Sequence, residues 1–313
     1  MAVSCILDCD PGHDDAIAIL LAAAHPGIDL RAITTVAGNG PLDKVTLNAR
    51  RVCTLAGVLQ VPIAAGADGP LDGKLDVAAD VHGKSALDGP DLPEPTVALD
   101  PRPAAELIAE ELRSATEPLT LVATGPLTNI ARVLVELEDK AAVREVVWMG
   151  GSTGRGNRAP YAEFNAHADP AAAAAVLGSG VPFTMLGLNL THQALATPDV
   201  VGRIGALGTP LADTVAGWLT FFGATYRSLF GFTAPPVHDP CAVALIAEPA
   251  VVRCVDAFVA VETEGRWTRG ATVADLDGRL GREANARVAV ELDVARFWEL
   301  VIAAIERLGR RAA

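Results

Sequence analysis

The most chemically suggestive stretch of the chain lies near its amino terminus, where four aspartates fall within eight residues. Residues 6–17 run Ile-Leu-Asp-Cys-Asp-Pro-Gly-His-Asp-Asp-Ala-Ile and contain Asp8, Asp10, Asp14 and Asp15. Side chains two apart on a strand share a face, so Asp8 and Asp10 should point the same way. Repulsion would raise the pKa of some of these carboxyls unless a cation lay among them. The cluster predicts a site for a hard, oxygen-preferring cation, calcium or magnesium.

Two buried elements would position these acids. The apolar run at 4–7 predicts a strand, and residues 16–24 predict the first turns of a buried helix. A turn between them would place Asp14 and Asp15 at the start of the helix, where the helix dipole favours negative charge. Helix capping explains one of these two acids, but it does not explain the acids that end a buried strand.

Beyond this stretch, apolar runs of strand length alternate with segments of helical pattern. We expect further strands over 30–36, 61–64, 119–123, 146–149, 183–188, 251–261, 268–273 and 286–292, and further helices over 43–56, 102–113, 128–137, 170–178, 211–229, from 241 onward and over 293–308. This alternation predicts an α/β fold, a mainly parallel open sheet with helices on both faces. The segments 251–261 and 268–273 would form a small antiparallel extension near the carboxyl terminus. No repeat or linker divides the chain, so we expect a single domain over residues 1–313.

Ligands of such sheets bind beyond the carboxyl ends of the strands. Asn39, Thr124 and Met149 each end or follow a predicted strand, as do the first aspartates. These groups are far apart in sequence, but one edge of a parallel sheet would bring them together. We therefore expect one site.

Two long connections could complete that site. Residues 66–95 are rich in glycine, proline and aspartate and contain His82, and a loop of this length in a compact domain is usually functional or mobile. The second connection, residues 152–168, carries Asn157, Glu163 and Asn165.

The charge of the chain narrows the range of partners. The net charge is −13, from 25 basic and 38 acidic residues, and the basic residues cluster only at Arg307, Arg310 and Arg311. A nucleic acid polymer requires a Lys/Arg surface that neutralises phosphates, so we expect no such partner. An acidic protein can still bind a neutral small molecule or a metal ion.

The cysteines and the apolar runs bear on the compartment. Five cysteines are scattered without a Cys-x-x-Cys pair, which predicts buried free thiols and a reducing, cytoplasmic setting. The chain enters a strand at once, with no basic-then-apolar leader. Its apolar runs end well before the roughly 18 residues that a membrane span needs, so we expect no membrane association.

The aspartate motif resembles the hallmark of nucleoside hydrolases of the inosine-uridine-preferring type. Those enzymes carry Asp-x-Asp-Pro-Gly-x-Asp-Asp near the amino terminus, and residues 8–15 match it at every fixed position. Similar blocks follow in the family's order: Thr-Thr-Val-Ala-Gly-Asn at 34–39, Thr-Gly-Pro-Leu-Thr-Asn at 124–129, Ala-Glu-Phe-Asn at 162–165 and His-Asp-Pro at 238–240. The resemblance spans most of the chain and implies the family's Rossmann-like fold.

The resemblance implies a calcium ion, Ca²⁺, held by Asp10, Asp15, the backbone carbonyl of Thr124 and Asp239. Calcium takes roughly six to eight oxygen ligands, so water and two ribose hydroxyls would complete its shell. Asp10 would also be the base that deprotonates the attacking water, whose pKa the cation lowers.

Further roles follow from the same resemblance. His238 would protonate the leaving base, since a neutral-range pKa suits a general acid. His82 either contacts the base or belongs to a mobile loop. Met149 either packs near the ribose or lies in the core. Tyr226 and Phe230 either line the base pocket or form an ordinary core stripe. His13 occupies a variable position of the motif and is assigned no role. The implied ribose contacts are Asp14, Asn39, Asn157, Glu163 and Asn165.

The implied reaction is calcium-dependent hydrolysis of the N-glycosidic bond of ribonucleosides to ribose and free base. Its transition state has oxocarbenium character, which anionic and hydroxyl-orienting groups around the sugar would stabilise. Two alternatives are a magnesium-dependent aspartate-based phosphatase, which expects Thr or Val where this chain has Pro11-Gly12, and a non-catalytic nucleoside-binding protein. The resemblance also implies a homodimer or homotetramer. The preferred base depends on residues 76–90 and 223–237 and does not follow from the sequence.

Overall fold

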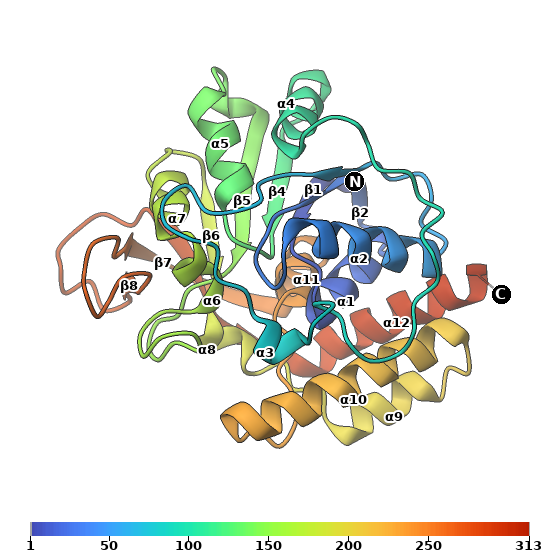
Figure 1. Ribbon diagram of the computed structural model, residues 1–313. Coiled ribbons are helices and arrows are strands. Elements are labelled where there is room, and N and C mark those ends of the chain that lie inside the picture. The colour runs from blue at the N-terminus through green and yellow to red at the C-terminus, as the bar shows by residue number, and fades with distance from the viewer. Residues whose placement is uncertain (1, 313) are drawn as a thin grey trace.

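The computed structural model describes residues 2–312, and within them nine strands form one sheet (Figure 1). The strands are β1 (Val3–Cys9), β2 (Ile28–Thr35), β3 (Ile63–Ala65), β4 (Leu119–Ala123), β5 (Val143–Met149), β6 (Phe183–Leu186), β7 (Val252–Val261), β8 (Thr272–Asp275) and β9 (Ala286–Leu292). Their order is β3-β2-β1-β4-β5-β6-β9-β7-β8. From β3 to β9 the neighbours run parallel, whereas β7 pairs antiparallel with both β9 and β8. The predicted parallel sheet with a small antiparallel extension is confirmed.

Helices cover both faces of this sheet. They are α1 (His13–Ala24), α2 (Leu42–Leu55), α3 (Ala79–His82), α4 (Ala104–Ser114), α5 (Thr128–Glu136), α6 (Phe164–Ala168), α7 (Pro170–Leu177), α8 (Leu188–Thr191), α9 (Pro198–Gly205), α10 (Pro210–Phe230), α11 (Pro240–Ala247) and α12 (Val294–Ala312), with short 3₁₀ turns at Lys140–Ala142 and Pro249–Val251. One layer contains α4, α5 and α7, and the other contains α1, α2 and α9 to α12. In Figure 1, α4 and α5 lie at the top, with α9, α10 and α12 at the bottom.

The two layers explain why the central strands are apolar on both faces. On β1, Leu7 packs into the core under α1, and Ile6 packs into the core under α4 and α5. The helix α1 contacts α11 and α12 as well as α2, so it is buried on nearly all sides. Its residues from Ala16 to Ala24 are therefore apolar and leave no polar face.

The predicted elements are confirmed, with shifts at their ends and a few additions. The strand β1 continues to Cys9, so Asp8 lies within the strand rather than after it. Short helices were not predicted: α3 interrupts the segment 66–95, α6 ends the segment 152–168, and α8 and α9 precede α10. Helices of four or five residues, such as α3, α6 and α8, show too few turns for a periodic pattern to identify them.

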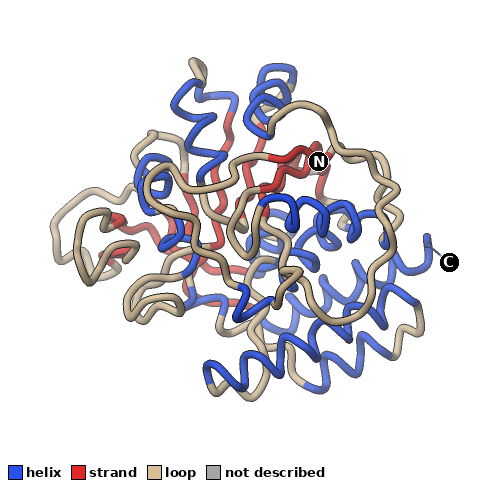
Figure 2. Tube along the Cα trace, viewed as in Figure 1, coloured by secondary structure: helices blue, strands red, loops and turns tan. Residues whose placement is uncertain are grey.

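The carboxyl ends of β1, β4 and β5 meet at one edge of the sheet, as predicted. The long connection between β3 and α4, tan except for α3 in Figure 2, passes near this edge. Between residues 2 and 312, no helix is long and apolar enough to cross a membrane.

Candidate active site

The first part of the site is the aspartate motif, held by hydrogen bonds between the end of β1 and the start of α1. The Asp15 carboxylate accepts from the amides of Asp10 (3.2 Å) and Gly12 (3.0 Å), and from the Thr124 hydroxyl (2.8 Å). The side-chain amide of Asn39 also donates to it at 3.0 Å. Groups from the ends of β1, β2 and β4 therefore fix one buried carboxylate.

Asp10 lies in a space that two glycines leave open. The amide of Asn39 donates to its Oδ2 at 2.6 Å, while its Oδ1 is buried without a hydrogen-bond partner. A Cβ at Gly38 would overlap Oδ2, and a Cβ at Gly125 would lie 2.7 Å from Oδ1. The surroundings thus admit the carboxylate of Asp10 and leave one of its oxygens free to act.

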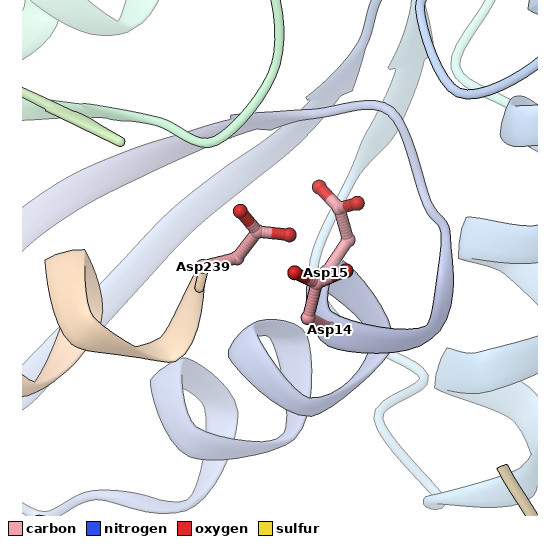
Figure 3. Close-up of side chains that lie close together, drawn as sticks. All are labelled: Asp14, Asp15 and Asp239. Atoms are coloured by element: carbon pink, nitrogen blue, oxygen red, sulfur yellow. The ribbon is translucent and has the colours of Figure 1, made fainter. Parts of the chain in front are cut away.

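Asp239 joins these aspartates from the other end of the sequence. It directly precedes α11, and its carboxylate lies with those of Asp14 and Asp15 so that one oxygen of each is within 4.8 Å of the others. Figure 3 shows the three side chains converging from the starts of α1 and α11. We call Asp10, Asp14, Asp15 and Asp239 the carboxylate floor.

Burial makes the floor electrostatically costly. It raises the pKa of Asp14 to about 7 and the pKa values of Asp10 and Asp239 well above the ordinary range, and neighbouring carboxylates raise all three further. Among the described residues around the pocket, Arg158 is the only arginine or lysine, and it pairs with Asp76. Buried carboxylates without a counter-charge, one with an unpartnered oxygen, fit a hard divalent cation.

A pocket of about 580 Å³, open mouth included, lies above the floor. It is lined by all of the predicted site residues except Asp10 and Asp15, which are fully buried beneath it. The residues that the structure brings to it are Asp14, Asn39, His82, Thr124, Met149, Asn157, Glu163, Asn165, Tyr226, His238 and Asp239.

One side of the pocket is polar and comes from the segment that ends in α6. Glu163 caps α6 and accepts from the amides of Gly151 (2.8 Å), Asn165 (2.9 Å) and Ala166 (3.1 Å). The side-chain amide of Asn165 donates to the Thr124 carbonyl (2.7 Å). Burial raises the pKa of Glu163 to about 7. These contacts orient carboxylate and amide groups toward a ligand that carries hydroxyls.

Another part of the lining consists of rings, which we call the ring wall: His82, Phe222, Tyr226, Phe230 and His238. The Tyr226 hydroxyl lies 2.8 Å from His238 Nε2, and its ring contacts those of Phe222 and Phe230 at centroid distances of 4.6 and 5.0 Å. Flat apolar faces with a few polar atoms suit a heteroaromatic base. The structure therefore places Tyr226 and Phe230 in the lining of the pocket, as the first of the two interpretations offered for them expects.

His238 is hydrogen-bonded through both ring nitrogens. Thr191 Oγ1 lies 2.8 Å from Nδ1, opposite the Tyr226 contact, and the His238 amide donates to Asp14 at 3.2 Å. Burial lowers the pKa of His238 to about 3, with a smaller effect of His192. The free protein therefore holds this ring neutral near pH 7.

Sequence reasoning missed three contributors to the site. His13 is buried and contacts His82, Thr191 fixes one nitrogen of His238, and Phe222 belongs to the ring wall. His13 carried a signal, since it lies within the aspartate motif. Thr191 lies on the unpredicted helix α8, and nothing in its sequence neighbourhood marks it.

An ion pair beside the pocket joins the two long loops. Arg158 donates to both carboxylate oxygens of Asp76, at 2.7 and 2.5 Å, and lies 3.4 Å from Asp80. Its guanidinium also stands 5.9 Å from the ring centroid of Phe164. The segment before α3 is thereby tied to the segment before α6.

A polar side, a side of rings and an acidic floor together define a pocket for a sugar joined to a flat base.

Comparisons with known proteins agree. Residues 5–299 match the family model described as inosine-uridine preferring nucleoside hydrolase. The chain is 45% identical to the pyrimidine-specific ribonucleoside hydrolases RihA of Shewanella woodyi, over 307 residues, and Escherichia coli, over 305 residues. The alignments cover 97% and 96% of this chain and 98% and 97% of those relatives.

Solved structures of the same kind superpose on the chain. A purine-preferring ribonucleoside hydrolase from Gardnerella vaginalis has a TM-score of 0.91 at 30% identity, covering 98% of this chain and 99% of that one. A plant nucleoside hydrolase has a TM-score of 0.89 at 27% identity, covering 99% of both. The chain belongs to the inosine-uridine preferring nucleoside hydrolase family. It is an enzyme that hydrolyses N-glycosidic bonds of ribonucleosides, so the phosphatase and the non-catalytic binding protein are ruled out.

Proposed function

We propose that this enzyme is a calcium-dependent hydrolase that prefers pyrimidine ribonucleosides. The observation that carries the proposal is the convergence of Asp239 with Asp14 and Asp15 beneath the pocket. The pyrimidine preference is supported by the relatives named as pyrimidine-specific, which are 45% identical, whereas the purine-preferring structure is 30% identical.

The residues present suit a calcium ion. Asp10, Asp15, Asp239 and the carbonyl of Thr124 would hold it, since all four offer oxygens and the carbonyl keeps a lone pair beside its bond from Asn165. The chemistry that such an ion supplies when bound is neutralisation of the floor and acidification of nearby water.

Asp10 is the proposed general base. Its Oδ2 is held by the Asn39 amide, and its Oδ1 has no hydrogen-bond partner. A water attacking without a covalent intermediate would give inversion at the anomeric carbon.

The sugar and the base would be held by different parts of the pocket lining. Asp14, Asn157 and Glu163 offer acceptors to ribose hydroxyls, while Asn39 and Asn165 already use their amide hydrogens on the protein. At the ring wall, His238 would donate a proton to the departing base, and the Tyr226 hydroxyl, 2.8 Å from its Nε2, would hold the ring in place.

A ribose-release assay tests the proposal directly. We expect uridine and cytidine to be cleaved faster than inosine, and chelation to remove activity that calcium restores. Equal rates on all three nucleosides would reject the pyrimidine preference. Full activity after exhaustive chelation would reject the calcium requirement while leaving the family assignment intact.

Chelation should also change the stability of the fold in a pH-dependent way. The raised pKa values of the floor mean that the metal-free folded state binds more protons than the unfolded state above about pH 4. The metal-free protein should therefore lose stability as the pH rises toward 7 and beyond. Thermal unfolding should show calcium stabilising the protein more at pH 8 than at pH 5, and equal stabilisation at both would contradict this.

Two further expectations accompany the proposal. All five cysteines are free and four are buried, which supports a reducing compartment, the cytoplasm. A homodimer or homotetramer remains a prediction from the resemblance, to be checked by light scattering on the eluting protein.

A further inference from the structure

A buried asparagine joins the aspartate motif to the turn that follows His82. Asn48 lies on α2, and its side-chain amide donates one hydrogen to the Pro11 carbonyl (3.0 Å) and the other to the Ser85 carbonyl (2.9 Å). Because carbonyls only accept, these two contacts fix the orientation of the amide and use both of its hydrogens. One side chain therefore bridges two segments that are far apart in the sequence.

The turn itself, residues 83–88, is compact and strained. The amide of every residue from 84 to 88 donates to an acceptor within residues 82–88. Ala86 has a φ of +64°, and among residues 2–312 it is the only residue other than glycine with a positive φ. Strain of this kind persists only where the surrounding structure holds it. The bond from the buried Asn48 amide is a contact of this kind, and it comes from outside the turn.

The turn determines where the ring of His82 lies. His82 is the last residue of α3, so the turn begins at the next residue. Its ring is buried in the pocket lining and stacks on Phe222 at a centroid distance of 5.3 Å. The ring also lies against Gly12, where a Cβ would be 2.6 Å from His82 Nδ1. This space between α10 and the aspartate motif is narrow, so a shift of the turn would move the ring out of its place in the lining.

We propose that Asn48 is a positioning residue, which ties the turn 83–88 to the aspartate motif and thereby keeps His82 in the ring wall. Asn48 is not among the residues that line the pocket, so it would act through His82. The Asp10 carboxylate is held separately, by the Asn39 amide at 2.6 Å, so the floor should keep its geometry without Asn48. The inference rests on the proposed function, in which the ring wall binds the base. The consequence is an effect on nucleoside binding rather than on bond cleavage.

A double-mutant cycle on KM tests this route. Asn48→Ala removes both hydrogen bonds and leaves a strong helix former in α2. We expect KM for uridine to rise about tenfold, the size of one or two buried hydrogen bonds, with kcat lowered less than about threefold. His82→Ala should raise KM by at least the same factor. In the double variant Asn48→Ala should add less than about twofold, because the side chain that it positions is gone.

Lys44→Met is the matched control. Lys44 lies one helical turn before Asn48 on α2 and donates to the Lys84 carbonyl at 2.6 Å, but its side chain is exposed. Water can replace an exposed bond, so KM and kcat should stay within about twofold of the wild type. A rise in KM as large as that of Asn48→Ala would show that the tie to the motif is not what matters, and it would count against the proposal.

Hydrogen exchange follows the turn without any substrate. In Asn48→Ala the amides of residues 84–88 should exchange at least about fivefold faster than in the wild type, because the turn opens locally. The amides of β1 and α1 should keep their wild-type rates. An equal acceleration over the whole chain would indicate a merely structural role and would contradict the proposal.

Three kinetic results would overturn the role of Asn48. They are a wild-type KM in folded Asn48→Ala or in His82→Ala, the same rise in KM with and without His82, and a fall in kcat without a rise in KM, which would place the effect at the floor. If Asn48→Ala fails to fold, Asn48→Ser, which keeps one donor, takes its place in the cycle. A failure of the proposed function appears separately, as a wild-type enzyme that prefers inosine to uridine. The same cycle run with inosine then decides the role of Asn48.

Discussion

The carboxylate floor and the ring wall meet at His238, whose amide donates to Asp14, but they are built differently. The floor lies on the ends of buried elements, with Asp10 after β1, Asp15 in the first turn of α1 and Asp239 just before α11. The ring wall comes from the four-residue helix α3, the last turns of α10 and the loop before α11. In the proposed mechanism, the floor supplies the groups that activate water, whereas the ring wall supplies the groups that bind the base and protonate it.

Removing the proposed general base, Asp10, should reduce the rate more than any other change. In Asp10→Ala, kcat should fall by about 10²–10⁴-fold, the usual contribution of a general base, or further if cation binding is lost as well. The fold should survive, because the change removes a buried charge whose raised pKa marks it as unfavourable. Steady-state kinetics and circular dichroism would check both points. Turnover close to that of the wild type would remove Asp10 from the base role.

A methyl group added beside the floor should also have a severe effect, although the substitution removes no functional group. In Gly38→Ala the new Cβ would overlap the Asp10 carboxylate and displace it. A displacement of about 1 Å can cost about 10²-fold in rate, so we expect a loss of that size in kcat. Gly154→Ala is the matched control, since a Cβ there meets no atom within 4 Å. Similar rates for the two variants would show that Asp10 tolerates movement and that the floor is less rigid than proposed.

The effect of a substitution in the ring wall on the rate should depend on the substrate, whereas the effect of a substitution in the floor should not. His238→Ala should lower cleavage of uridine and inosine about 10²-fold but spare a nitrophenyl riboside, whose leaving group needs no proton. The variant should also lose about 1–3 kcal/mol of stability, because Thr191 and Tyr226 lose a buried partner. Equal losses on all substrates would contradict the role of His238 as an acid.

The same contrast explains how much the sequence could predict. The strands and long helices were predicted because buried parallel strands and amphipathic helices have strong apolar patterns. The convergence of Asp10, Asn39 and Thr124 followed from the rule that strand ends meet at one edge of the sheet. These predictions rest on local patterns and on topology, which a sequence expresses directly.

The ring wall did not follow in the same way. The stacking of His13 on Phe221 and Phe222 joins the start of α1 to the middle of α10 through the turn after α3. Such a contact depends on the path of a long loop whose conformation no periodic pattern specifies. The role of Thr191 was missed for a related reason, since it lies on a four-residue helix.

The smallest effect should come from the ion pair beside the pocket, which belongs to neither region. In Arg158→Gln the link between Asp76 and the segment before α6 would be lost. We expect KM to rise about two- to fivefold with kcat nearly unchanged, because a partly exposed ion pair contributes about 1 kcal/mol or less. Arg155→Gln, an exposed arginine of the same loop, is the control and should behave like the wild type. A fall of kcat by more than about tenfold in Arg158→Gln alone would place the guanidinium among the groups that act on the substrate. The division into a catalytic floor and a recognising wall would then need a third region.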